Sequence, residues 1–172
     1  LWKVGQTRPE PGTAVVVSQR GEWAYLLSAL HLFSAPLGET EIRRVRLSGP
    51  AIDPLDTNRP EQLLVARSRG DDIALLKVRA SGPNIPRVRL AKFSGRGPME
   101  SYGFAVARDS GEFPAPEIKG GTLSETLRDG REVLTTNATL LPGMSGGPVL
   151  REGMVVGVVR GQPAHGGEHL IA

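Results

Sequence analysis

Apolar residues recur along this chain in short runs, and almost none of these runs is long enough for an ordinary helix. Val, Ile and Leu dominate the runs, which are separated by Gly, Pro, Asp and Asn. Runs of this kind are typical of β-strands. The pattern predicts an all-β protein with strands at residues 14–18, 25–28, 41–47, 63–67, 73–78, 99–107, 118–126, 132–135, 149–150, 154–160 and 169–171.

Residues 79–87 divide the predicted strands into two groups. This segment contains two prolines, a glycine and an asparagine, which is a composition typical of a linker. We therefore expect two β-barrels or sandwiches, one built from residues 1–80 and the other from residues 81–172. Residues 50–60 and 108–116 are predicted to be long surface loops.

Composition excludes several classes of protein. A hydrophobic content of 39% excludes a disordered chain, and no apolar run approaches the roughly 18 residues that cross a bilayer. The chain has no cysteine, which removes disulfides and thiolate metal sites. The densest basic cluster, Arg43, Arg44 and Arg46, lacks the interleaved aromatic residues of a nucleic-acid platform. We interpret this cluster as a solvated strand face and expect no nucleic-acid partner.

The two ends of the chain indicate a piece of a longer protein. The sequence starts at Leu1 without an initiator methionine, and it ends at Ala172 just after an apolar pair. We expect any targeting signal or partner domain to lie outside these residues. The compartment therefore stays open.

Residues 141–149 form a glycine-rich stretch around Ser145, which we call the serine loop. Gly143, Gly146 and Gly147 permit backbone torsions that are closed to other residues, and they let main-chain N–H groups approach a substrate atom. Ser145 is therefore a candidate nucleophile. Taken alone, the stretch is explained equally well by a tight turn whose serine bonds its own backbone.

Gly143, Ser145 and Gly147 also fit the G-x-S-x-G nucleophile elbow of α/β-hydrolases. That motif needs a strand, a sharp turn and then a helix, with the acid and the histidine following the serine. No aspartate follows Ser145, and the β-branched run at residues 155–159 favours strands. Both the order and the local structure exclude the elbow.

A serine hydroxyl needs a base within hydrogen-bond reach and a group that orients this base. We interpret His165 as a residue of a surface loop and His169 as a residue of a short terminal strand, neither with a special role. His31 differs because it ends the apolar run at residues 24–30, where a chain leaving a buried strand turns towards an interface. His31 is the candidate base, and a hydrogen-bonded core histidine is the alternative.

Asp71 and Asp72 stand directly before the apolar run at residues 73–78. This position puts a carboxylate at the mouth of a predicted buried strand. A plain loop-to-strand turn explains the pair as well.

Three segments together resemble the trypsin-like serine proteases. Residues 27–31 resemble their strand-to-histidine segment, residues 72–78 their aspartate segment, and residues 142–149 their nucleophile loop. The order histidine, aspartate, serine is that of chymotrypsin and differs from the subtilisin and hydrolase orders. The resemblance covers nearly the whole chain. It is nearest to bacterial, disulfide-free members of the HtrA/Deg type, or to trypsin-like domains fused to effector modules.

The resemblance implies two six-stranded antiparallel β-barrels with the active site in the cleft between them. It implies that Ser145 attacks the scissile carbonyl, that His31 takes and returns the proton, and that Asp72 fixes the tautomer of His31. Asp71 is the alternative acid. The N–H groups of Gly143 and Ser145 would form the oxyanion hole. No metal or cofactor is implied.

The resemblance also places five residues around the primary specificity pocket. They are Thr139, Leu140, Val159, Arg160 and Gly161. Thr139 falls near the base of the pocket, where trypsin has an aspartate, so we expect no preference for Arg or Lys. Arg160 near the wall would favour an acidic or polar substrate residue, and a solvent-facing arginine is the alternative.

Met144 stands where trypsin-type zymogens carry the aspartate that pairs with a newly cleaved amino terminus. Activation by that route is not expected. Family members without the pair are controlled by loop ordering or by appended domains, and a flip of the turn at residues 141–145 would abolish the oxyanion hole. We therefore expect a serine endopeptidase for protein or peptide substrates, regulated by a domain or partner outside this chain. The rival is a protein-binding module that keeps the protease fold with silent catalysis.

Overall fold

Strands account for nearly all of the regular structure. The structure, a computed structural model, describes residues 2–3, 11–33, 42–93, 95–104, 116–128, 131–163 and 169–172. Within these ranges it has fourteen β-strands and two 3-10 helices, which confirms the all-β prediction. The elements are, in chain order, β1 (Trp2–Lys3), β2 (Val15–Arg20), β3 (Trp23–Ala29), η1 (Leu30–Leu32), β4 (Ile42–Gly49), β5 (Ile52–Thr57), η2 (Pro60–Leu63), β6 (Leu64–Ser68), β7 (Ile73–Arg79), β8 (Arg89–Leu90), β9 (Arg96–Phe104), β10 (Pro116–Arg128), β11 (Arg131–Thr136), β12 (Pro148–Arg151), β13 (Met154–Pro163) and β14 (His169–Ile171).

The N-terminal half, residues 1–80, holds two antiparallel sheets. One has the strand order β2-β3-β7-β6, and the other has the order β1-β4-β5. Along β3 and β7 buried residues alternate with less buried ones. The register pairs Leu26 with Leu76 and Ala24 with Val78, and all four side chains are buried. This apolar layer fixes the register of the two strands whose ends carry the candidate site.

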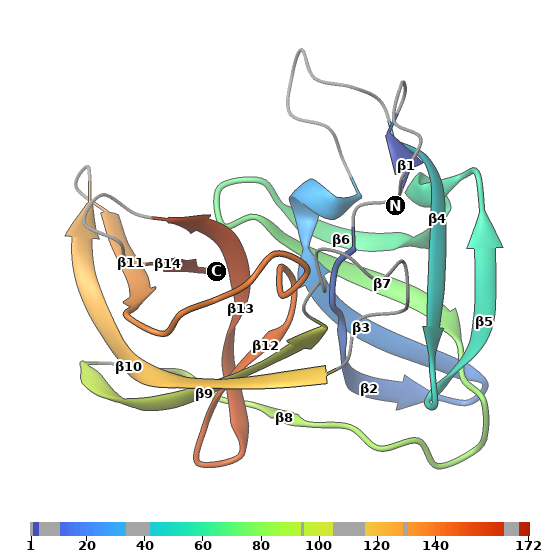
Figure 1. The fold of residues 1–172 in the computed structure, drawn as a ribbon. Helices are drawn as coiled ribbons and strands as arrows, with labels where there is room; N and C mark the ends of the chain where they lie inside the picture. The colour runs from blue at the N-terminus through green and yellow to red at the C-terminus, as the bar shows by residue number, and fades with distance from the viewer. Residues whose placement is uncertain are drawn as a thin grey trace.

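The C-terminal half, residues 81–172, closes on itself. Its strands follow the order β12-β9-β10-β11-β14-β13-β8, and β12 also pairs with β13. The additional pairing joins six strands into a ring, to which β8 is attached in parallel through β13. Its core contains Met99, Leu123, Met144 and Val149. In Figure 1 this half runs from green at β8 to red at β14 and lies beside the blue to green N-terminal half.

The C-terminal half has a ring of six strands, but a second six-stranded barrel is not established for the N-terminal half. In the described part of the chain, β4 pairs with β1 and β5 only, so the N-terminal strands stay in two separate sheets. These sheets share one apolar core, to which Val45 and Ile52 contribute from one sheet and Leu76 from the other. An isolated bridge between Ile52 and Ala80 connects them at one end. The fold is one ring of strands beside a pair of packed sheets.

The expected surface loop at residues 50–60 is wrong, because it contains β5 and the start of η2. Pro54 and two aspartates lower the strand propensity of this segment, so its pattern did not predict a strand. The strand forms because β5 is the edge of its sheet, where Pro54 needs no ladder partner on its open side. Pairing of Leu55 with Leu47 on β4, and burial of Ile52, hold it in place.

Between β7 and β8 the chain is irregular over most of the segment predicted as a linker, residues 79–87, of which Arg79 still belongs to β7. It runs along β2, where the Val88 N–H donates to the Val16 carbonyl at 3.1 Å. Ile85 is buried, and its N–H donates to Gln19 Oε1 at 3.1 Å. The linker is thus attached to the N-terminal half along its length. The other predicted loop, residues 108–116, lies outside the described residues except for Pro116, which begins β10.

Arg44 and Arg46 are exposed on β4, which confirms the solvated strand face for these two members of the basic cluster. Arg44 Nε donates to Asp56 Oδ1 at 2.7 Å across the β4–β5 pair. This hydrogen bond raises the pKa of Arg44 and lowers that of Asp56.

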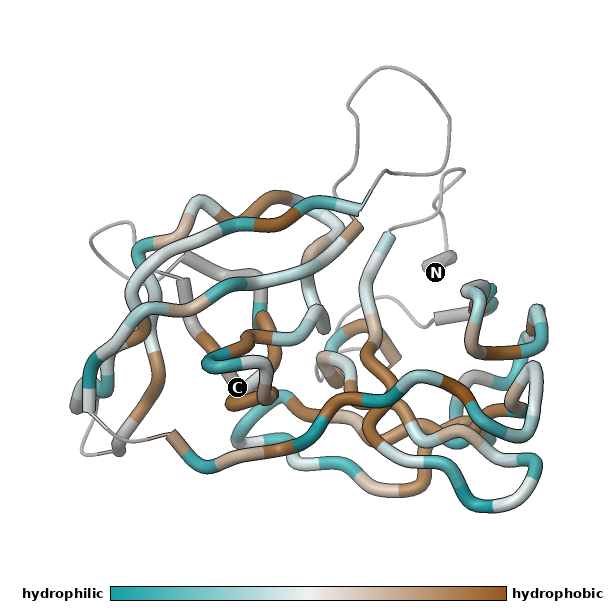
Figure 2. Tube along the Cα trace, turned by 90° about the horizontal axis from the view of Figure 1, so that it is seen from below, coloured by the Kyte–Doolittle hydropathy of each residue, from teal (hydrophilic) through white to brown (hydrophobic). Residues whose placement is uncertain are grey.

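Hydrophobic residues lie mainly along the strands, and the outer turns are hydrophilic. Figure 2 shows this as brown segments inside each half and teal at the turns. In the ranges given above, no helix has the length and apolar character that a membrane span requires.

Candidate active site

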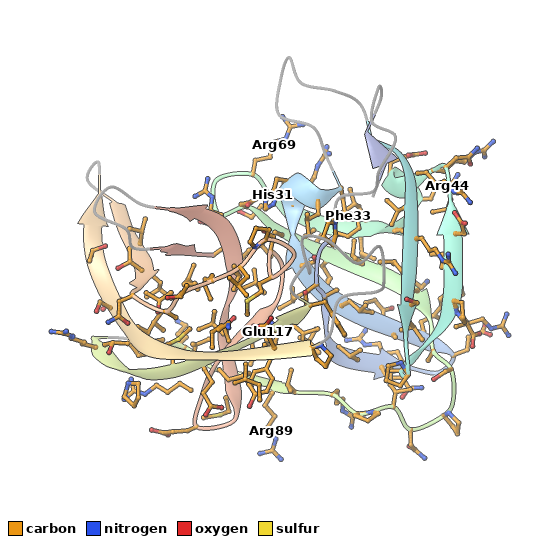
Figure 3. All side chains as sticks on the ribbon, viewed as in Figure 1. His31, Phe33, Arg44, Arg69, Arg89 and Glu117 are labelled. Atoms are coloured by element: carbon orange, nitrogen blue, oxygen red, sulfur yellow. The ribbon has the colours of Figure 1, made fainter. Side chains whose placement is uncertain are left out.

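His31 lies in the short 3-10 helix η1, directly after β3. The residues on either side of it, Leu30 and Leu32, are buried and anchor this turn in the core. The His31 side chain keeps about a third of its surface exposed, at 34%. Figure 3 shows it at the junction of the two halves. The end of an apolar strand is therefore followed by a partly exposed imidazole.

Asp72 reaches His31 from the neighbouring strand. It directly precedes β7, whose first residue Ile73 pairs with Ala29 at the end of β3. The Asp72 carbonyl accepts the Leu30 N–H at 2.8 Å, and its Oδ1 accepts the His31 N–H at 2.8 Å. Asp72 has a φ of 59°, in the left-handed region that Asp tolerates better than most residues. This backbone turn aims the carboxylate at η1.

The carboxylate of Asp72 also fixes the ring of His31. His31 Nδ1 lies 2.7 Å from Asp72 Oδ2, and the Asp72 side chain is only 11% exposed. A carboxylate is an acceptor only, so Nδ1 must carry the proton, and Nε2 of the neutral ring is left as an acceptor. Asp71, the alternative acid, instead accepts the Ser68 hydroxyl at 2.6 Å on the surface. The pair that forms is His31 with Asp72.

Arg160 adds a positive charge to this pair. It lies on β13, and its Nε is 3.7 Å from Asp72 Oδ2. The Arg160 side chain is about as exposed as that of His31, at 35%. Sequence analysis gave Arg160 two alternatives, a pocket wall or solvent, and did not anticipate a contact with the acid. The Asp72 carboxylate thus lies between a histidine and an arginine.

The serine loop begins with a β-turn over residues 141–144. The Met144 N–H donates to the Leu141 carbonyl at 3.1 Å, and Gly143 has a φ of +93°. Proline at the second position keeps φ of Pro142 negative, so a positive φ at the third position identifies a type II turn. In a type I turn the third residue would have a φ near −90°, and the central peptide would face the opposite side. The turn type therefore decides where the Gly143 N–H points.

The amides of the serine loop fall into two sets. The N–H groups of Met144, Gly146 and Gly147 donate to carbonyls of Leu141, Val159 and Met144, respectively, at 3.1, 2.7 and 2.8 Å. Within the described part of the chain, the N–H groups of Gly143 and Ser145 donate no hydrogen bond. Unpaired amides in a largely buried loop are unfavourable unless an acceptor arrives. These two amides are available to a ligand oxygen.

Gly146 packs directly on the strand that leads to His31. A Cβ at this glycine would lie 2.2 Å from the Thr13 carbonyl oxygen, 2.3 Å from Ser28 Oγ and 2.8 Å from the Ala29 nitrogen. Its φ of +80° also disfavours other residues. The glycine is therefore required for the loop to approach β3. Ser145 and His31 form no direct hydrogen bond among the described residues, and such contacts are often loose before substrate binds.

Sequence comparison identifies the family. A family model for the trypsin-like peptidase domain matches residues 12–158. The chain belongs to this family. No curated protein sequence matches it significantly.

Solved protease structures share the fold of this trypsin-like peptidase domain. The active form of the Rv3671c protease from M. tuberculosis superposes with a TM-score of 0.65 at 19% identity, over 93% of this chain and 67% of that one. The inactive form gives a TM-score of 0.63 at 17% identity, over 93% and 76%. The HtrA-type protease AlgW with a decapeptide gives 0.62 at 20% identity, and the match covers 93% of this chain but 46% of AlgW. At these identities the likeness concerns the fold.

The expected specificity residues of the peptidase domain occupy different environments. Leu140 and Val159 are buried, and the Val159 N–H donates to the Gly147 carbonyl at 2.9 Å. Thr139 is exposed, and Gly161 lies within β13. None of these residues, nor Arg160, is acidic. Among the described residues there is also no group of three His, Asp or Glu side chains that could hold a metal ion.

Sequence analysis missed Thr13 and Ser28 in this peptidase domain. The Thr13 N–H donates to the Ser145 carbonyl at 2.8 Å, and Ser28 Oγ donates to the Thr13 carbonyl at 2.7 Å. Both are polar residues in or beside predicted strands. Ser28 lies in the segment 27–31, whose resemblance selected only His31, and no motif marks Thr13. Of the remaining histidines, His165 lies outside the described residues, and His169 belongs to β14.

Proposed function

We propose that this chain is a serine endopeptidase in which Ser145 is the nucleophile, His31 the general base and Asp72 the residue that orients the base. One observation carries the proposal: the His31–Asp72 pair, joined at 2.7 Å, lies at the end of the strand on which the serine loop packs through Gly146. We further propose that the active site lies between the halves formed by residues 1–80 and 81–172.

The chemistry follows from the protonation state of His31. With its proton held at Nδ1 by Asp72, Nε2 accepts the Ser145 proton as Oγ attacks the substrate carbonyl carbon. The imidazolium that forms is stabilised by the Asp72 carboxylate, and it then protonates the leaving amine. Water, deprotonated by the same Nε2, hydrolyses the acyl-enzyme and regenerates Ser145.

The unpaired amides of Gly143 and Ser145 are proposed as the oxyanion hole. Negative charge develops on the carbonyl oxygen in the transition state, and two fixed N–H donors stabilise it without reorganisation. The type II turn supports this role because it leaves the Gly143 N–H unbonded in the described part of the chain. Control by a partner or an appended domain would act on the same turn.

Substituting Gly143→Ala is expected to lower kcat by roughly 10²–10³-fold, which is the usual effect of losing one oxyanion donor. An alanine at a φ of +93° is strained, so the turn shifts towards type I and its central N–H turns away. Steady-state kinetics on a protein or peptide substrate measure the change. Gly21→Ala is the control, because Gly21 has a φ of +58° in open space. An unchanged kcat in Gly143→Ala would contradict the proposed donor.

We propose protein or peptide substrates cleaved after residues other than Arg and Lys. Support comes from the expected pocket residues, none of which is a carboxylate that could pair with a basic side chain. Arg160, whose Nε lies 3.7 Å from Asp72 Oδ2, also places a positive charge near the site, which disfavours a basic substrate residue.

A peptide library incubated with the chain, with cleavage sites identified by mass spectrometry, tests this proposal. We expect cleavage that depends on Ser145, with few sites after Arg or Lys. Efficient cleavage after these two residues would overturn the specificity. Absence of any cleavage by folded protein would favour a binding module that keeps the fold.

A further inference from the structure

Thr13 binds the serine loop on both sides of Met144. It is 7% exposed and belongs to the irregular segment before β2. Its N–H donates to the Ser145 carbonyl at 2.8 Å, and its hydroxyl donates to the Gly143 carbonyl at 2.9 Å. These carbonyls precede and follow Met144. Thr13, which lies outside the serine loop, therefore fixes the peptide planes 143–144 and 145–146. The unpaired N–H groups of Gly143 and Ser145 lie in the planes directly before these, 142–143 and 144–145.

Thr13 is itself held from two other elements. Ser28 Oγ donates to the Thr13 carbonyl at 2.7 Å, and Ser28, which is 1% exposed, lies on β3 three positions before His31. The Phe104 N–H, at the end of β9, donates to the Thr13 hydroxyl at 3.0 Å. Thr13 thus connects the strand of His31, the serine loop and β9 through four hydrogen bonds.

We propose that Thr13 is a positioning residue that sets the separation between Ser145 and His31. This inference rests on the proposed roles of Ser145 and His31 as nucleophile and base. Reacting groups must lie within a narrow range of distances, and a displacement of about 1 Å can lower the rate by about 10²-fold. The position requires a hydroxyl, because the side chain must donate to one main-chain group and accept from another at the same time.

The substitution Thr13→Val tests the role of the hydroxyl. Valine keeps the branched shape but leaves the Gly143 carbonyl and the Phe104 N–H without their partner. We expect kcat to fall by about 10- to 100-fold and KM to change by less than about 3-fold, because positioning is lost but the binding surface is not. Thr13→Ser, which keeps the hydroxyl, is expected to restore kcat to within about 3-fold of the wild-type value.

Thr135→Val is the matched control for the loss of a buried threonine hydroxyl. Thr135 is 4% exposed, and its hydroxyl has no hydrogen-bond partner in the described part of the chain. Rates are expressed per active site, titrated by the burst of acyl-enzyme, so that unfolded protein does not contribute. Thr135→Val is expected at most to lower the number of titratable sites. If Thr13→Val also lowers only this number and leaves kcat per site unchanged, Thr13 is a structural residue and the proposal fails.

Hydrogen exchange provides a readout that does not need catalysis. We expect the amides of Gly146 and Gly147 to exchange faster in Thr13→Val than in wild-type protein, and to be unchanged in Thr135→Val. Unchanged exchange rates in Thr13→Val would overturn the proposal for Thr13. An inactive wild-type chain would instead overturn the proposed function, and the exchange measurement would still test Thr13. If Thr13→Val does not fold, the variant Ser28→Ala tests the proposal in its place. It removes only the bond to the Thr13 carbonyl, and the proposal requires faster loop exchange in this variant as well.

Discussion

Replacing Ser145 with alanine is expected to lower kcat by roughly 10⁶-fold, which is the effect of removing the nucleophile from a serine protease. The fold should not change, because the loop is held through main-chain groups. Both the Ser145 carbonyl, bound to Thr13, and the type II turn at residues 141–144 are retained in the variant. The residual rate over water then reflects the oxyanion donors and substrate binding.

Kinetics with a fluorogenic peptide chosen from the library, together with thermal melting, measure the effect of Ser145→Ala. The melting temperature should match that of the wild type. Ser48→Ala controls for the loss of any serine hydroxyl, because Ser48 is exposed on β4. Retention of more than about a hundredth of wild-type kcat in Ser145→Ala would remove Ser145 from the mechanism.

Asp72→Asn is expected to lower kcat by about 10⁴-fold. The amide oxygen can still accept the His31 N–H, but the amide NH₂ then faces Nδ1, which must become an acceptor. The ring proton moves to Nε2, so His31 can no longer take the proton from Ser145. Asparagine also tolerates the φ of 59° at this position, so the backbone turn should survive.

Asp71→Asn is the matched control for Asp72→Asn. Asp71 accepts the Ser68 hydroxyl on the surface, so its loss should leave kcat nearly unchanged. The comparison also decides between the two acids that the sequence left open. Equal losses of kcat in both variants, or a larger loss in Asp71→Asn, would contradict the assignment of Asp72.

The strands that carry the candidate site were predictable because each contains a short apolar run. Which face of β3 and β7 is buried could not be predicted in this way, because Leu27 and Leu75 on the less buried face are apolar as well. Strand β5 was not predictable, because Pro54 is tolerated only at a sheet edge, and the edge position of β5 arises from its pairing with β4. The arrangement of N-terminal strands in two sheets also depends on pairings that the pattern does not encode.

The site was predictable where a residue type, a spacing and an order combine. His31 and Asp72 were selected in this way, and the structure brings them together at 2.7 Å. Thr13 and Arg160 were not selected for their contacts, because these form only in the folded chain. Thr13 bonds to a carbonyl 130 positions away, and nothing in its sequence surroundings marks it. Long-range polar contacts of single residues carry no local pattern.

The central claim is that Ser145 is a nucleophile activated by His31, and a fluorophosphonate probe tests it most directly. The probe is incubated with wild-type chain, with Ser145→Ala and with His31→Ala, and the modified residue is located by mass spectrometry. The account predicts a single adduct on Ser145 in the wild type and none in either variant. A folded wild-type chain that forms no adduct, or forms it on another residue, would contradict the account.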